Sequence, residues 1–202
     1  MSRNFVVLER SAEEELLEGP HLSEPTASRE YTELIRQLFP SPAAVAVAGT
    51  IPGEDVSGIC ADLAKELASS GKRVLVASVQ KLLRMRPIPV PDATVFLPGE
   101  IPNVWSWRTS PGPKLEIFRS PVTTEKQWLD TLRRNFDSVV LDCSAVSAES
   151  DVADVAALAD ATVLIVEAGK TDKQRIRDLQ QTLESRGARV AGIVLVLPKV
   201  IL

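Results

Sequence analysis

From residue 43 onward, short apolar runs alternate with amphipathic segments, and this alternation restricts the fold more than any other feature of the sequence. Strands are predicted at 43–47, 74–79, 138–142, 162–166 and 190–197. Helices are predicted at 56–70, 124–135, 151–158 and 171–185, where Thr171 and Gln174 form a capping-box pattern. Such alternation is typical of a parallel sheet covered on both faces. The expected class is therefore α/β, with a doubly wound, mostly parallel sheet.

The chain before residue 43 has a different composition. Residues 1–28 contain Gly19, Pro20 and a cluster of glutamates, a polar mixture that predicts a flexible acidic extension. The domain is expected to span 29–202 and to begin with a helix at 29–39. The apolar stripe of this helix is expected to dock on the domain or on a neighbouring copy; it consists of Tyr31, Leu34, Ile35 and Leu38.

Residues 81–121 are rich in proline and are the hardest part to interpret. Only 94–97 and 115–118 have the pattern of short strands, and Trp105 and Trp107 lie between them. The tryptophans either cover the sheet or form part of a docking surface.

Bulk properties exclude several classes of function. The 202 residues carry a formal net charge of −4, which does not favour general binding to nucleic acid or to anionic lipid. No run approaches the roughly 20 apolar residues that cross a bilayer, so we expect a cytoplasmic protein without direct membrane insertion. Cys60 and Cys143 lack metal-ligand spacing and are expected to be buried, reduced thiols. No metal site is predicted.

The turn at 50–57 follows the first of these strands and precedes a helix, which is where a phosphate-binding P-loop lies. Such a loop has the pattern Gly, four residues, Gly-Lys-Ser/Thr. Here Asp55 replaces the second glycine, Val56 replaces the lysine, and only Ser57 fits. A hydrogen bond to a charged group contributes about 1.5–3 kcal/mol, so loss of the lysine alone weakens nucleotide binding roughly ten- to a hundredfold. Tight triphosphate binding is not expected.

Longer stretches nevertheless resemble one family. The segments concerned are Pro52-Gly53-Glu54-Asp55-Val56-Ser57, Gly71-Lys72-Arg73-Val74-Leu75, Phe136-Asp137-Ser138-Val139-Val140-Leu141-Asp142 and Ala159-Asp160-Ala161-Thr162-Val163. In this order and spacing they are similar to the bacterial tyrosine kinases of capsular and exopolysaccharide export, and more widely to the MinD and ParA ATPases. The resemblance covers the chain from about residue 29 and implies a P-loop NTPase-like fold.

The departures from this family fall on its chemistry. The family's two aspartates after the second strand correspond to Ser78 and Gln80, and its base-contacting asparagine corresponds to Val196. The family's tyrosine acceptor cluster is absent, since Tyr31 is the single tyrosine. The resemblance therefore implies a degenerate, pseudokinase-like member without catalytic residues.

Four positions remain as vestigial nucleotide contacts: Gly53, Glu54, Ser57 and Asp142. Asp142 ends a strand in the crevice where doubly wound sheets bind ligands. Its carboxylate either binds magnesium or water, or caps a nearby turn. A third hypothesis is an unrelated enzyme that uses Asp142, Cys143 and Ser144. The sequence shows no base or oxyanion partner for it.

The interaction candidates are Glu30, Tyr31, Leu34, Arg36, Trp105 and Trp107. The resemblance aligns Glu30, Glu33 and Arg36 with the family's oligomerisation pattern Glu-x-x-Arg-x-x-Arg, in which Glu33 replaces an arginine. This change argues against a ring like that of the kinases, although a homo-oligomer is still possible. The alternative is that Glu30, Glu33 and Arg36 are ordinary solvated charges of a helix.

Two functions follow. The first is a catalytically inactive kinase-like scaffold or regulator in polysaccharide biosynthesis or export. It would use no cofactor and bind a polysaccharide-export membrane protein or an active kinase relative at the inner face of the membrane. The second is a MinD/ParA-type switch that binds ATP and magnesium weakly, with a lysine such as Lys170 or one from a partner chain compensating for Val56.

Overall fold

The computed structural model describes residues 4–8, 32, 35–36, 38–39, 43–52, 54–79, 96–107, 125–144 and 149–197. Its strands are β1 (Asn4–Leu8), β2 (Ala43–Gly49), β3 (Val74–Ser78), β4 (Phe96–Pro98), β5 (Val104–Trp107), β6 (Ser138–Asp142), β7 (Ala161–Glu167) and β8 (Val190–Val196). Its helices are α2 (Val56–Ser69), α4 (Glu125–Asn135), α5 (Glu149–Ala156) and α6 (Lys173–Ser185).

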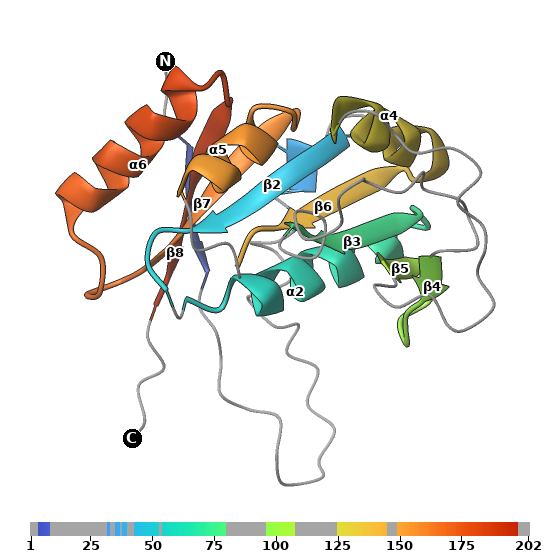
Figure 1. Ribbon diagram of the computed structural model, residues 1–202. Coiled ribbons are helices and arrows are strands. Elements are labelled where there is room, and N and C mark those ends of the chain that lie inside the picture. The colour runs from blue at the N-terminus through green and yellow to red at the C-terminus, as the bar shows by residue number, and fades with distance from the viewer. Residues whose placement is uncertain are drawn as a thin grey trace, which may run out of the picture.

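Within this described part, the strands form one sheet in the order β1-β8-β7-β2-β6-β3-β5-β4. All neighbouring strands are parallel except β4 and β5. Helices α4, α5 and α6 lie on one side of the sheet and α2 on the other (Figure 1). The predicted α/β class, with a mostly parallel sheet and helices on both faces, is confirmed.

The central strands are buried on both faces, which explains their continuous apolar sequences. Every residue of β6 is buried, and so are all but the last residues of β2 and β7. Helix α2 buries Ile59, Leu63 and Leu67, which recur every four residues as predicted. The chain turns after α2 at Gly71, whose φ of 81° suits glycine.

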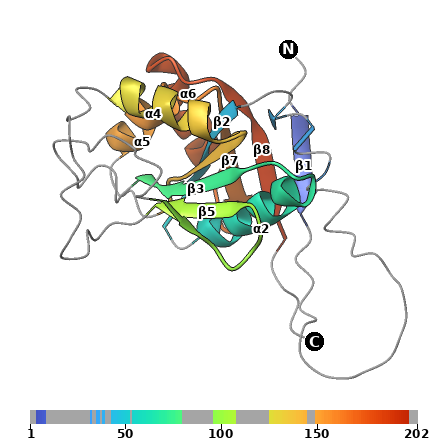
Figure 2. The ribbon, with the colours of Figure 1, turned by 90° about the vertical axis from the view of Figure 1, so that its right-hand side faces the viewer.

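The prediction of a flexible extension at 1–28 is wrong for residues 4–8. These residues form β1, which pairs in parallel with β8 from Asn4↔Gly192 to Leu8↔Val196. Figure 2 shows the two strands side by side at one edge of the sheet. The remaining residues of that segment lie outside the described part.

The proline-rich segment also contains more sheet than expected. Val104–Trp107 is strand β5, which extends the sheet beyond β3 in parallel register, Val74↔Val104. Of the two strands expected there, the first corresponds to β4 at Phe96–Pro98, and residues 115–118 are outside the described part.

The helix predicted at 29–39 is described at four positions, Thr32, Ile35, Arg36 and Leu38, all of which are helical. Leu38 is 6% exposed and packs, with Phe39 and Ile35, on the same apolar cluster as α2. These apolar side chains of the segment are therefore taken up by the domain itself.

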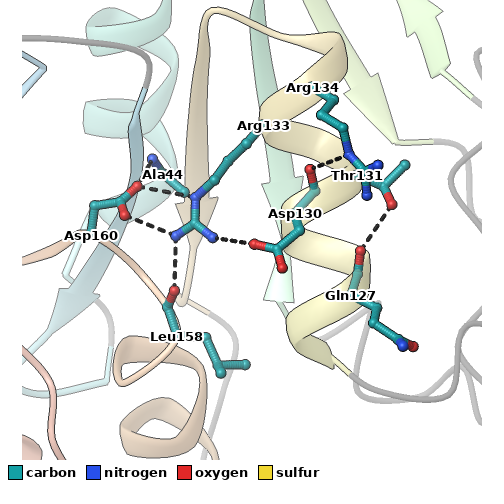
Figure 3. Close-up of polar contacts among 8 residues, drawn as sticks. All are labelled: Ala44, Gln127, Asp130, Thr131, Arg133, Arg134, Leu158 and Asp160. Carbon is teal, nitrogen blue, oxygen red and sulfur yellow. Dashed lines mark hydrogen bonds and ion pairs between the residues drawn. The ribbon is translucent and has the colours of Figure 1, made fainter.

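A polar clamp lies at the amino ends of β2 and β7 (Figure 3). Asp160 accepts a hydrogen bond from Ala44 N at 2.7 Å and donates its own N–H to Ala44 O at 2.8 Å. From α4, Arg133 Nη2 donates to Leu158 O at 3.0 Å. The clamp joins α4 and the start of β7 to β2, the strand that leads into the loop at 50–57.

Candidate functional site

The loop at 50–57 and Asp142 meet at the carboxyl ends of neighbouring strands. Strand β2 runs parallel to β6, with Val47 opposite Asp142. The Ser57 Oγ, in the first turn of α2, donates to Asp142 Oδ2 at 2.7 Å. This crevice is the place where doubly wound sheets bind ligands.

Asp142 is engaged by its neighbours in the crevice. Its Oδ1 accepts from Ser144 N at 2.9 Å, and the Ser57 and Ser144 hydroxyl oxygens lie 2.8 Å apart. The side chain is buried, with 9% of the residue exposed. These contacts fit a carboxylate that caps the turn after β6.

Asp55 and Val56 are the loop residues at which the P-loop pattern predicts glycine and lysine. Asp55 is the N-cap of α2, and its Oδ1 accepts from Gly58 N at 2.9 Å. Val56 is 1% exposed and belongs to the apolar cluster under α2. The start of α2 therefore has a carboxylate from the chain itself at its positive end.

Glu54 points inward from the loop and is only 8% exposed. Its carboxylate accepts from Thr50 and Ile51 in the loop and from Glu167 N at the end of β7. It also accepts from the hydroxyl of Thr171 at 3.2 Å. Sequence reasoning named Glu54 as a vestigial cofactor contact but missed its role within the loop and its threonine partners.

The capping box predicted from Thr171 and Gln174 is wrong. The N-cap of α6 is Asp172, whose Oδ1 accepts from Gln174 N at 2.8 Å. The Thr171 hydroxyl is not free to cap, because it contacts Glu54 and lies 3.1 Å from the Thr50 hydroxyl.

Cations near the loop come from the segment after β7. Lys170, the predicted substitute for the missing lysine, has its Nζ 2.7 Å from Glu167 Oε1. Arg175 Nε, on α6, donates to Thr50 O at 3.4 Å. The sequence analysis did not name Arg175 as a site residue. It lies 125 residues from Thr50, and nothing in the sequence around it indicates this contact.

Both cysteines are buried and free. Burial, reinforced by the Asp142 carboxylate, raises the pKa of Cys143 to about 12. Burial likewise raises the pKa of Cys60 well above its ordinary value. Neither thiol is therefore a nucleophile at neutral pH, because the thiolate is the reactive form. Within the described ranges, no group of three or more His, Cys, Asp or Glu is placed to hold a metal ion.

The predicted interaction residues are only partly described. Trp105 is partly buried, and its ring lies against Phe136 with centroids 6.3 Å apart, while Trp107 ends β5. Arg36 is exposed. Gly53 of the loop and Glu30, Tyr31 and Leu34 lie outside the described residues. No helix in the described part is long and apolar enough to cross a membrane.

No protein-family model matches the chain. Over 172 residues, 75% of its length, it is 30% identical to the succinoglycan biosynthesis transport protein ExoP of Rhizobium meliloti strain 1021. Over 66 residues, 33% of its length, it is 29% identical to the tyrosine-protein kinase CpsD of Streptococcus pneumoniae. The chain is a relative of the bacterial tyrosine kinases of polysaccharide export. The aligned segments span 22% of ExoP and 29% of CpsD.

The fold agrees with this family. The BceF tyrosine kinase domain has a TM-score of 0.65 and is 21% identical, and the match covers 84% of this chain and 76% of that domain. The match shows that this chain shares the fold of that domain.

Proposed function

We propose that this chain is a catalytically inactive tyrosine kinase-like domain that acts by binding protein partners in polysaccharide biosynthesis or export. The observation that carries the proposal is the environment of Val56. At the position where the family has a phosphate-binding lysine, the chain has a valine that is 1% exposed and packed in the core. A buried apolar side chain supplies no charge to a phosphate.

Two further observations support the loss of nucleotide chemistry. Asp55 brings a negative charge to the start of α2, where the helix dipole would otherwise favour a phosphate. Ser78 and Gln80 provide no carboxylate to replace the family's aspartates. No cofactor is therefore part of the proposed function.

The partner class follows from the relatives. ExoP is by name a biosynthesis transport protein, and CpsD a tyrosine-protein kinase. We place the action of this chain beside an export membrane protein or an active kinase, in the cytoplasm at the inner face of the membrane. The exposed Arg36 and its neighbours Glu30, Tyr31 and Leu34 are the candidate contact residues; Trp105 is a weaker candidate because its ring lies on the core.

Calorimetry with ATP or GTP and magnesium tests the catalytic half of the proposal. The expected result is no saturable heat at submillimolar nucleotide. Saturable binding would instead favour a MinD/ParA-type nucleotide-binding switch, for which the contact of Arg175 with Thr50 O is the supporting observation. Arg175→Met would then abolish the binding.

Affinity capture from the native host tests the partner half. The expected result is recovery of a polysaccharide-export membrane protein or of an active kinase relative. Substitution of Tyr31, Leu34 or Arg36 should weaken that recovery, whereas Lys65→Ala, an exposed change on α2, should not. Equal recovery with every variant would remove these residues from the interface.

A further inference from the structure

Five hydrogen bonds end on the carboxylate of Glu54. Thr50 donates through both its backbone N and, at 2.9 Å, its hydroxyl. Ile51 N donates at 3.2 Å, Glu167 N at 3.1 Å and the Thr171 hydroxyl at 3.2 Å. Each donor is an amide or a hydroxyl, and the carboxylate is almost fully buried.

The geometry at Thr50 and Ile51 is that of an anion-binding nest. Two successive backbone N–H groups point at a single oxygen, Glu54 Oε2. Successive N–H groups in a turn form concavities that hold anions such as phosphate. In this chain the anion in the nest is supplied by the loop itself.

The same carboxylate joins segments that are distant in sequence. Its Oε1 accepts from Glu167 and Thr171, which lie 113 and 117 residues further along the chain. These two donors belong to the end of β7 and to the turn before α6. Glu54 therefore connects the loop after β2 with the segment that leads into α6.

Gly49 shows how closely the carboxylate fits. A Cβ at this position would lie 2.8 Å from Glu54 Oε2, a separation that real Cβ atoms essentially never show. The carboxylate therefore occupies space that a side chain at Gly49 would fill. Burial of a carboxylate is costly unless its oxygens are well hydrogen-bonded, and here both oxygens are.

We propose that Glu54 is a built-in anion that holds Thr50 and Ile51, after β2, together with Glu167 and Thr171 in the β7–α6 turn. The amides of Thr50 and Ile51 then need no bound phosphate, because Glu54 accepts their hydrogen bonds. The proposal concerns how the loop is held, and it stands whether or not the chain binds protein partners.

Amide hydrogen exchange of Glu54→Gln tests the proposal. The amide side chain keeps the size of Glu54 but has one acceptor oxygen and places an NH₂ group against the donors. Exchange at Thr50, Ile51 and Glu167 should become about tenfold faster or more, because their hydrogen bonds open locally. Val140 in β6 should exchange as in the parent protein. Glu184→Gln is the matched control, since Glu184 is exposed and accepts from Gln180 on its own helix.

Chemical rescue provides a second measurement. Glu54→Ala leaves the nest without its anion, so formate should restore slow exchange at Thr50 and Ile51, whereas chloride at the same ionic strength should not. Unchanged exchange in both Glu54 variants would overturn the proposal. So would an equal acceleration at Val140, because Glu54 would then contribute to global stability alone.

If neither Glu54 variant folds, Thr171→Val decides the question. This change removes one donor and leaves the carboxylate in place. It should accelerate exchange at Glu167 and Ile51 but not at Val140. Exchange that remains slow at both sites would overturn the proposal.

Discussion

Arg133 holds both carboxylate oxygens of Asp160. Its Nε donates to Oδ2 at 3.2 Å and its Nη2 to Oδ1 at 3.0 Å, which is the bidentate geometry of a guanidinium fork (Figure 3). The third nitrogen, Nη1, donates to Asp130 on the same helix at 2.9 Å. One arginine thus fixes α4 to the turn before β7. This turn lies at the amino ends of the strands, whereas the loop at 50–57 lies at their carboxyl ends.

Arg133→Met should destabilise the domain while preserving the bulk of the side chain. The Arg133 and Asp160 side chains are 25% and 45% exposed, so water screens part of the interaction. We expect the free energy of unfolding to fall by about 1–2 kcal/mol. Urea unfolding measures the change. Arg134→Met is the control and should have little effect, because among the described residues Arg134 donates to Asp130 O on its own helix.

Restoring the P-loop residues should restore nucleotide binding. Asp55→Gly with Val56→Lys reintroduces the two missing types, and a glycine N-cap costs only a few tenths of a kcal/mol relative to aspartate. Calorimetry should show ATP binding about ten- to a hundredfold tighter than in Asp55→Gly with Val56→Met. Equal affinity in the two double variants would mean that the loop is not a vestigial phosphate site.

The buried thiols predict a loss of stability at high pH. Above the ordinary thiol pKa of 9.0 the unfolded chain loses the Cys143 proton, while the folded protein keeps it up to a pKa of about 12. The contribution is therefore fully present below pH 9.0 and is lost as the pH rises towards about 12. The slope from one thiol is at most about 1.4 kcal/mol per pH unit.

Urea unfolding at pH values on both sides of 9.0 checks this slope. Cys143→Ala should show a shallower decline than the parent protein over that range, since one titrating group has been removed. An identical decline would show that other groups account for the alkaline loss.

Gly49→Ala should be destabilising because of Glu54. The new Cβ would lie 2.8 Å from Glu54 Oε2 and 3.1 Å from Val56 Cγ2, so we expect overpacking of about 1–3 kcal/mol. A double-mutant cycle separates the two contacts. In a Glu54→Ala background the same change should cost less, and an undiminished cost would assign the clash to Val56.

Much of the framework is predictable because it depends on local patterns. Strand β6 follows from a continuous apolar run ending in Asp142, and α2 follows from Ile59, Leu63 and Leu67 at helical spacing. The apolar run at 5–8 carries the signal for β1, but the acidic composition that follows it masks that signal. Pairing with β8 decides its structure, and that pairing joins residues nearly 190 positions apart, as in Asn4↔Gly192.

The interior of the loop is not predictable in the same way. Glu54 lies in a turn with proline, glycine and aspartate, and nothing in this neighbouring sequence indicates that its carboxylate is buried. Its partners Glu167 and Thr171 reach it through the register of β7 beside β2. Similarly, Thr171 fits a capping box by type, but Asp172 provides the cap once Glu54 engages the Thr171 hydroxyl.

The parallel pairing of β1 with β8 also has a mechanical consequence. Because the two strands run parallel, Asn4 lies at one end of the pair and Val196 at the other. A force that pulled them in opposite directions would load the hydrogen bonds between β1 and β8 in shear, all at the same time. Such an arrangement resists tension better than a hairpin whose bonds open one by one. The domain would therefore withstand being pulled between two partners attached at its opposite ends.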